Sequence, residues 1–225
     1  AEMLKGGSRK GLTLKDMTST QRTLTHKLLQ TALSEAGHEK IKKIMFLEDI
    51  LFVLEGKSRR FIRDSEMYHI LIFGIPGKNA WGWRFEGHHI SLNYTVAGSK
   101  VSVVPSFWAS NPAVADFGPG RSLWVLKNEE HLARKLRLSL TDSQAKFAII
   151  ADKAPRDILT AALPEVKSFG DMGIGYNKLK EDQQKLLVSL IKEYINRHRT
   201  VVAKEDWAKI EKASLSKILF SWAGS

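Results

Sequence analysis

Most of the side chains that could perform chemistry fall in one short stretch, residues 81–93. The stretch reads Trp-Gly-Trp-Arg-Phe-Glu-Gly-His-His-Ile-Ser-Leu-Asn. A carboxylate and an imidazole held close together can exchange protons with a substrate, and an arginine can bind a carboxylate or phosphate through two parallel hydrogen bonds. The sequence therefore predicts catalytic roles for Arg84, Glu86, His88 and His89.

The same stretch could hold a divalent metal ion. His88 and His89 would supply imidazole ligands and Glu86 a carboxylate, a donor set that suits zinc or non-heme iron. The sequence offers only one histidine pair and no two histidines spaced four residues apart. A bound metal cofactor is therefore a hypothesis. The spacing of the histidines does not favour it over acid–base catalysis without a metal.

A binding protein without catalytic activity is the alternative function. Tryptophan rings together with an arginine would form an aromatic, cationic pocket for a small anionic or sugar-like ligand. The residues predicted to bind such a ligand, besides Arg84, are Trp81, Trp83, Ser91, Asn93, Trp108 and Asn111. Both functions imply a small-molecule partner.

The composition favours a globular protein with a sizeable core, because 43% of its 225 residues are hydrophobic and 26% are charged. The net charge of +11 permits contact with nucleic acid, but the basic residues form only short, dispersed clusters. Nucleic-acid binding is therefore the third choice of function. Without cysteine the chain has no thiolate metal site. No apolar run reaches the roughly 20 residues of a membrane span.

The positioning element of the site is predicted to be a long strand, residues 80–97. Apolar side chains occupy odd positions before Gly87 and even positions after it. Because a bulge adds one residue and glycine tolerates its backbone, the pattern predicts a bulge at Gly87-His88. His88 would be aimed away from the resulting polar face, which would carry Arg84, Glu86, His89, Ser91, Asn93 and Thr95. An ordinary solvated sheet face is the simpler interpretation.

The remaining pattern predicts an α+β fold, namely an antiparallel β-meander with flanking helices and a helical C-terminal third. Gly37 is expected to end the first helix, and residues 50–54 could be helix or buried strand. The loop 105–120 is expected to cover the polar face. Strands are predicted at residues 68–73, 80–97 and 101–104, and helices at 19–36, 38–56, 128–138, 142–151, 179–197 and 204–222. The helices 19–55 and 178–197 should pack on the sheet of a single domain, residues 1–225.

The chain resembles an uncharacterised domain-of-unknown-function (DUF) family found widely in bacteria and some eukaryotes. The resemblance is carried by the run 81–93, together with Arg63-Asp64, Phe73-Gly74-Ile75-Pro76, Asn111-Pro112 and Glu129-Glu130. It implies an exported protein in many members and supplies no reaction. Members extend further at both ends, with a later strand that bears a histidine. The resemblance therefore implies that this chain is trimmed or divergent at its ends.

Overall fold

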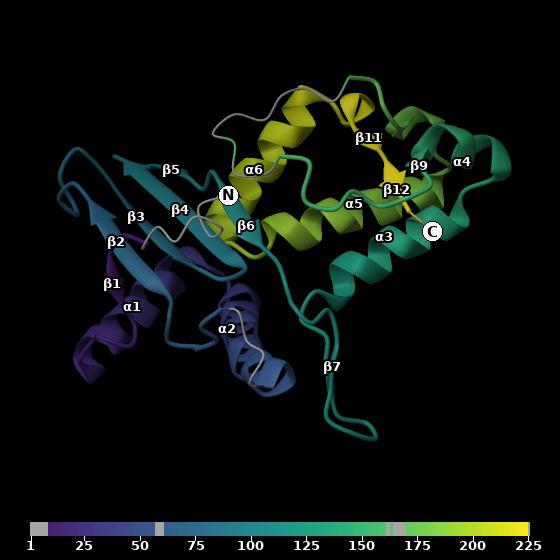
Figure 1. The fold of residues 1–225 in the computed structure, drawn as a ribbon. Coiled ribbons are helices and arrows are strands. Elements are labelled where there is room, and N and C mark those ends of the chain that lie inside the picture. Colours follow the sequence, from purple (N-terminus) through teal and green to yellow (C-terminus); the bar gives the residue numbers. More distant parts are fainter. Residues whose placement is uncertain (1–8, 57–60, 161–162, 164–169, 225) are drawn as a thin grey trace. The chain divides into compact units, whose positions relative to one another are not determined.

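A computed structural model describes residues 9–56, 61–160, 163 and 170–224 (Figure 1). The described residues form two compact units. One runs to residue 126 and includes residues 197–199, and the other contains residues 127–196 and 200–224. The return of residues 197–199 to the first unit is fixed by a hydrogen bond of 2.5 Å between the Tyr94 hydroxyl and Nδ1 of His198. The single domain expected from the sequence stays a prediction.

The first unit is built on an antiparallel sheet in the order β1-β2-β3-β4-β5, with β6 also paired to β4. The strands are β1 (Leu12–Thr13), β2 (His69–Phe73), β3 (Ala80–Gly87), β4 (Ile90–Ala97), β5 (Lys100–Ser102) and β6 (Ser106–Trp108). Consecutive strands from β2 to β5 are neighbours, so the predicted meander and α+β class are confirmed.

Two helices cover one face of this sheet, α1 (Ser19–Ala32) and α2 (Glu35–Glu55) (Figure 1). Thr18 begins α1 with a reciprocal capping box to Gln21, and Ser34 begins α2 by accepting a hydrogen bond from the amide of Gly37. Gly37 therefore lies in the first turn of α2, and its predicted role at the end of α1 is wrong. The alternative that residues 50–54 form a strand is also wrong, because α2 continues to Glu55.

The predicted long strand is two strands joined by a turn. Gly87 at the end of β3 pairs with Ile90 at the start of β4, which leaves only His88 and His89 in the turn. The predicted bulge at Gly87-His88 is therefore wrong. The two-residue turn explains the change from odd to even apolar positions. In such a hairpin each odd-numbered residue of β3 lies opposite an even-numbered residue of β4, on the same face of the sheet.

The hairpin separates the apolar and polar side chains as predicted, apart from the histidines. Phe85 pairs with Leu92 and Trp83 with Tyr94 on the helix-covered face, where all four are buried. On the opposite face, hereafter the polar face, Arg84 pairs with Asn93, Glu86 with Ser91 and Gly82 with Thr95. His89 lies in the turn and is not part of this polar row.

The segment after β5 is more ordered than a loop. Strand β6 pairs with the start of β4, next to the turn, with Ser91 opposite Phe107. Further along, β7 (Ala115–Asp116) pairs with β8 (Ser122–Leu123). The interpretation of residues 105–120 as an unstructured loop is therefore wrong.

The second unit is mostly helical and has its own core. Its elements are α3 (Lys127–Ser139), α4 (Asp142–Ala148), β9 (Ile149–Ala151), β10 (Ile174–Gly175), η3 (Tyr176–Lys178), α5 (Glu181–Ile195), α6 (Thr200–Ala213), η4 (Leu215–Lys217), β11 (Leu219–Phe220) and β12 (Trp222–Ala223). Leu136 of α3 and Leu187 of α5 meet in its core. The stripe of α5 is thus buried in this unit, although the sequence pattern placed it on the sheet.

The last helix is shorter than predicted. It ends at Ala213, and Ser214 follows with a φ of 77°, a backbone conformation that a helix cannot contain. Residues 215–223 form a 3₁₀ turn and two short strands. Within the described part of the chain, no helix is long and apolar enough to cross a membrane.

The close approach of Gly87 to Tyr68 predicts that a side chain at position 87 destabilises the protein. A Cβ built there would lie 2.3 Å from Cδ1 of the buried Tyr68 ring. We expect Gly87→Ala to lower the free energy of unfolding by about 1–3 kcal/mol, because the ring has no free space to move into. Denaturant unfolding followed by tryptophan fluorescence measures this change.

Gly175→Ala is the control for this substitution. Its Cβ would lie 3.9 Å from the nearest atom, and the residue has an ordinary φ of −69°. We expect a change within about 0.5 kcal/mol. Equal losses in the two variants would mean that the close approach of Gly87 to Tyr68 has no energetic consequence.

Candidate functional site

The candidate site lies at the turn between β3 and β4, where His88 and His89 are adjacent. The Tyr68 hydroxyl donates a hydrogen bond to the backbone carbonyl of His88, and the Tyr68 ring lies under Gly87. His89 has a φ of 64°, in the left-handed region that residues other than glycine adopt uncommonly. Tyr68, which directly precedes β2, thus holds the turn in place.

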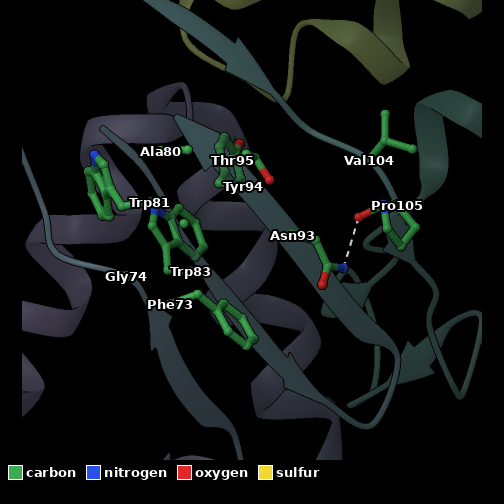
Figure 2. Close-up of a pocket in the computed structure, with 11 residues that line it drawn as sticks. Phe73, Gly74, Ala80, Trp81, Trp83, Asn93, Tyr94, Thr95, Val104 and Pro105 are labelled. Atoms are coloured by element: carbon green, nitrogen blue, oxygen red, sulfur yellow. Dashed lines mark hydrogen bonds between the residues drawn. The ribbon is translucent and has the colours of Figure 1, made fainter. Parts of the chain in front are cut away.

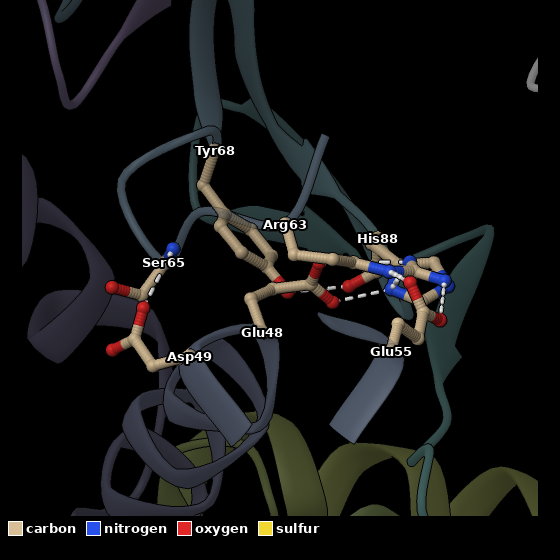
Figure 3. Close-up of polar contacts among 7 residues, drawn as sticks. All are labelled: Glu48, Asp49, Glu55, Arg63, Ser65, Tyr68 and His88. Carbon is tan, nitrogen blue, oxygen red and sulfur yellow. Dashed lines mark hydrogen bonds and ion pairs between the residues drawn. The ribbon is translucent and has the colours of Figure 1, made fainter. Parts of the chain in front are cut away.

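His88 forms a carboxylate–imidazole pair with Glu48 of helix α2. Nδ1 of His88 is hydrogen-bonded to Oε1 of Glu48, a carboxylate that is only 3% exposed (Figure 3). Pairing with an ionised carboxylate, which only accepts, assigns the proton to Nδ1, and the Arg63 guanidinium, which only donates, contacts the same nitrogen. Nε2 therefore holds the lone pair of the neutral ring, and it has no hydrogen-bond partner among the described residues.

Arg63 completes the charge balance around this pair. Its guanidinium makes two hydrogen bonds to the Glu55 carboxylate, of 2.9 and 2.6 Å, and one of its nitrogens lies 3.7 Å from Oε2 of Glu48 (Figure 3). The hydrogen bonds that Arg63 donates to Glu55 raise the pKa of Arg63, which stays cationic. Arg63 also lies 3.2 Å from Nδ1 of His88, so the two carboxylates, the guanidinium and the imidazole form one connected cluster.

His89 is a neutral neighbour of this cluster. Its ring centroid lies 3.7 Å from that of His88. Burial, followed by electrostatic effects of the neighbouring His88 and Arg63, lowers the pKa of His89 to about 4. Its Nε2 is buried and has no hydrogen-bond partner among the described residues. At neutral pH the turn therefore presents one imidazole tied to a carboxylate and a second that is uncharged.

The other two predicted catalytic residues lie elsewhere on the hairpin. Arg84 and Glu86 form an ion pair of 3.1 Å on the polar face, whereas His88 reaches a helix that covers the opposite face. The structure therefore divides the four predicted residues into two pairs. Glu48, and not Glu86, is the carboxylate that contacts a histidine of the turn.

The predicted ligand-binding residues are divided between the core, the polar face and the surface, and three of them, Trp81, Trp83 and Asn93, border one hollow. The Trp83 ring is buried in the core and stacks on Tyr94 at 4.3 Å, and Trp108 is also buried. Trp81 is half-buried against the same core, and Asn111 is exposed. Ser91 and Asn93 lie on the polar face beside Glu86 and Arg84, their partners across the hairpin.

Sequence reasoning missed Glu48, Glu55, Arg63 and Tyr68. One signal for Glu48 was present, because it falls on the buried stripe of α2, in line with Ile41, Ile44 and Leu51. A carboxylate at a core position of a helix needs a partner. Arg63 is among the residues that carry the family resemblance, but no sequence pattern marks it, Glu55 or Tyr68 as a partner of the turn.

The metal hypothesis gains no support from the described residues. They contain no group of three or more His, Cys, Asp or Glu side chains that could hold a metal ion. At the turn, Nδ1 of His88 is already engaged by Glu48.

Comparison with known families identifies the family of the chain. The family model described as "Protein of unknown function (DUF3500)" matches residues 3–225. The chain belongs to this family. Searches of curated proteins and of solved structures find no significant match. Membership of DUF3500 confirms the resemblance to a domain-of-unknown-function family, and the function must be argued from the cluster at the turn.

The burial of Glu48 predicts a stability effect. Glu48→Gln keeps the shape of the side chain but removes the negative charge that faces His88 and Arg63. We expect a loss of about 1–3 kcal/mol in the free energy of unfolding, measured by denaturant titration at pH 7. The control is Glu181→Gln, which breaks an exposed ion pair to Lys185 and should cost no more than about 0.5 kcal/mol. A loss for Glu48→Gln as small as the control would contradict the pairing.

The lowered pKa of His89 predicts a pH dependence of stability. In the unfolded chain a histidine titrates near 6.5, but in the folded protein His89 titrates near 4. Between pH 4 and 6.5 the unfolded state binds more protons than the folded state. The contribution of His89 to the free energy of unfolding is therefore complete above about pH 6.5 and is lost as the pH falls toward 4. We expect His89→Asn, which tolerates the same backbone, to lose less stability than the wild type between pH 7 and 4.5. Parallel curves for the two proteins would show that His89 is not buried in its neutral form.

Proposed function

We propose that the protein is an enzyme that uses His88 as a general acid–base catalyst on a small polar substrate. The observation that carries this proposal is the contact of Nδ1 of His88 with the buried carboxylate of Glu48, while Nε2 has no partner among the described residues. A carboxylate in this position orients the imidazole and stabilises the imidazolium that forms when the ring accepts a proton.

The surrounding cluster is suited to this proton transfer. Nε2 of His88 would take a proton from water or from a substrate hydroxyl, and would return it to the leaving group. The Glu48 carboxylate balances the imidazolium, and Glu55 neutralises Arg63, so the ring can become charged without facing an unpaired cation. His89 is neutral above about pH 4 and adds no positive charge beside the ring.

The experiment compares carboxylate and imidazole variants on a panel of p-nitrophenyl substrates, namely acetate, phosphate and glycosides. We expect at least one to be turned over, and His88→Ala to lower kcat by roughly 100- to 10,000-fold. Glu48→Gln should lower kcat in the same direction because the ring loses its orienting partner. The control is His131→Ala on α3, which lies outside the cluster and should leave the rate unchanged.

Two outcomes would contradict the proposal. A rate that is lost equally in His88→Ala and His131→Ala would show non-specific reaction with histidine side chains. A rate that depends on Glu86 and not on Glu48 would move the acid–base chemistry to the polar face. Circular dichroism of each variant separates loss of chemistry from loss of the fold.

A further inference from the structure

The polar face of the hairpin contains a hollow that is separate from the cluster at the turn. Its volume is about 440 Å³, within the range of small-molecule sites (Figure 2). It is lined by Phe73, Gly74, Ala80, Trp81, Gly82, Trp83, Asn93, Tyr94, Thr95, Val104 and Pro105. Since Phe73 pairs with Gly82 and Gly82 with Thr95, these three residues share the face that borders the hollow.

Two polar groups in the lining are available to a ligand. The Asn93 side-chain amide donates to the carbonyl of Pro105 at 3.0 Å (Figure 2). It also donates to Ser91 at 3.3 Å, and the two hydrogen bonds fix its orientation. Its Oδ1 remains as an acceptor without a partner among the described residues, and the same holds for the Thr95 hydroxyl. The hollow thus offers one fixed acceptor and one hydroxyl that can donate or accept.

The walls are apolar and carry no charge. Phe73 is 49% exposed, and Val104 and Pro105 border the hollow from the segment after β5. No residue of the lining is ionisable apart from Tyr94, which is buried in the core. The nearest charges along the polar face, Arg84 and Glu86, are paired with each other. This arrangement favours a neutral ligand over an anion, in contrast to the cationic pocket expected from the sequence.

We propose that this hollow binds a neutral sugar of one or two rings. A sugar ring has an apolar C–H face that fits against an aromatic ring, and its edge carries hydroxyls that both donate and accept hydrogen bonds. Phe73 supplies the flat apolar surface, and Asn93 and Thr95 supply the polar partners. The proposal stands independently of the chemistry at His88.

Neighbouring residues of β2 provide a matched pair of variants. Phe73 and Ile72 are almost equally exposed, at 49% and 48%, but they face opposite sides of the sheet. Phe73→Ala removes the wall of the hollow, and Ile72→Ala removes a similar apolar side chain outside it. Thr95→Val removes only the hydroxyl and keeps a β-branched side chain in the strand.

The test is binding of maltose, cellobiose and N,N′-diacetylchitobiose to the purified chain, measured by isothermal titration calorimetry. We expect at least one to bind with a Kd on the order of 1 mM or below. Phe73→Ala and Thr95→Val should each weaken that binding about tenfold, and Ile72→Ala should change it less than about twofold.

Three outcomes would overturn the proposal. They are no saturable binding of any of the three sugars, equal weakening by Phe73→Ala and Ile72→Ala, and binding of glucuronate that is tighter than that of the neutral sugars. Because none of these variants touches His88 or Glu48, p-nitrophenyl turnover measured in parallel keeps failure of sugar binding distinct from failure of the acid–base proposal.

Discussion

A carboxylate buried in the apolar face of a helix is the constraint on which the candidate site depends. Glu48 lies among the core residues of α2 and is only 3% exposed, so an unpaired charge there would cost several kcal/mol. The turn between β3 and β4 brings His88 to this carboxylate, and the segment before β2 brings Arg63. The buried charge of Glu48 therefore links three parts of the chain, namely helix α2, the β3–β4 turn and the segment before β2.

The backbone around the turn shows the same constraint. Gly87 leaves room for the Tyr68 ring, which stacks on Phe85 with centroids 5.7 Å apart and reaches the carbonyl of His88 through its hydroxyl. His89 then adopts a positive φ that is unfavourable for its side chain. A turn that needed only to connect two strands would use glycine or asparagine at this position. A histidine at this position therefore carries a conformational cost that glycine would avoid.

Much of the fold could be predicted because helix caps and alternating strands are local signals. Thr18 and Thr141 begin helices where the sequence places them, and the meander follows from short connections between strands. The hairpin was missed because a bulge and a two-residue turn both shift the alternation by one position. Length was the signal that separates them, since 18 residues exceed the usual length of a strand. The Gly87-His88-His89 sequence also lacks the Asn-Gly or Asp-Gly pair that marks tight hairpins.

The chemistry was harder to predict than the fold because its partners are distant in the sequence. Arg84 and Glu86 drew attention by lying beside the histidines, but their spacing of two residues places them next to each other on one face, where each neutralises the other. The partner of His88 lies 40 residues earlier, on a helix whose register decides that Glu48 faces inward. Only the packing of α2 on the sheet brings these two side chains together. A tight turn above a buried carboxylate therefore creates an oriented imidazole from residues that no linear motif connects, while the same hairpin leaves its uncharged hollow on the other face.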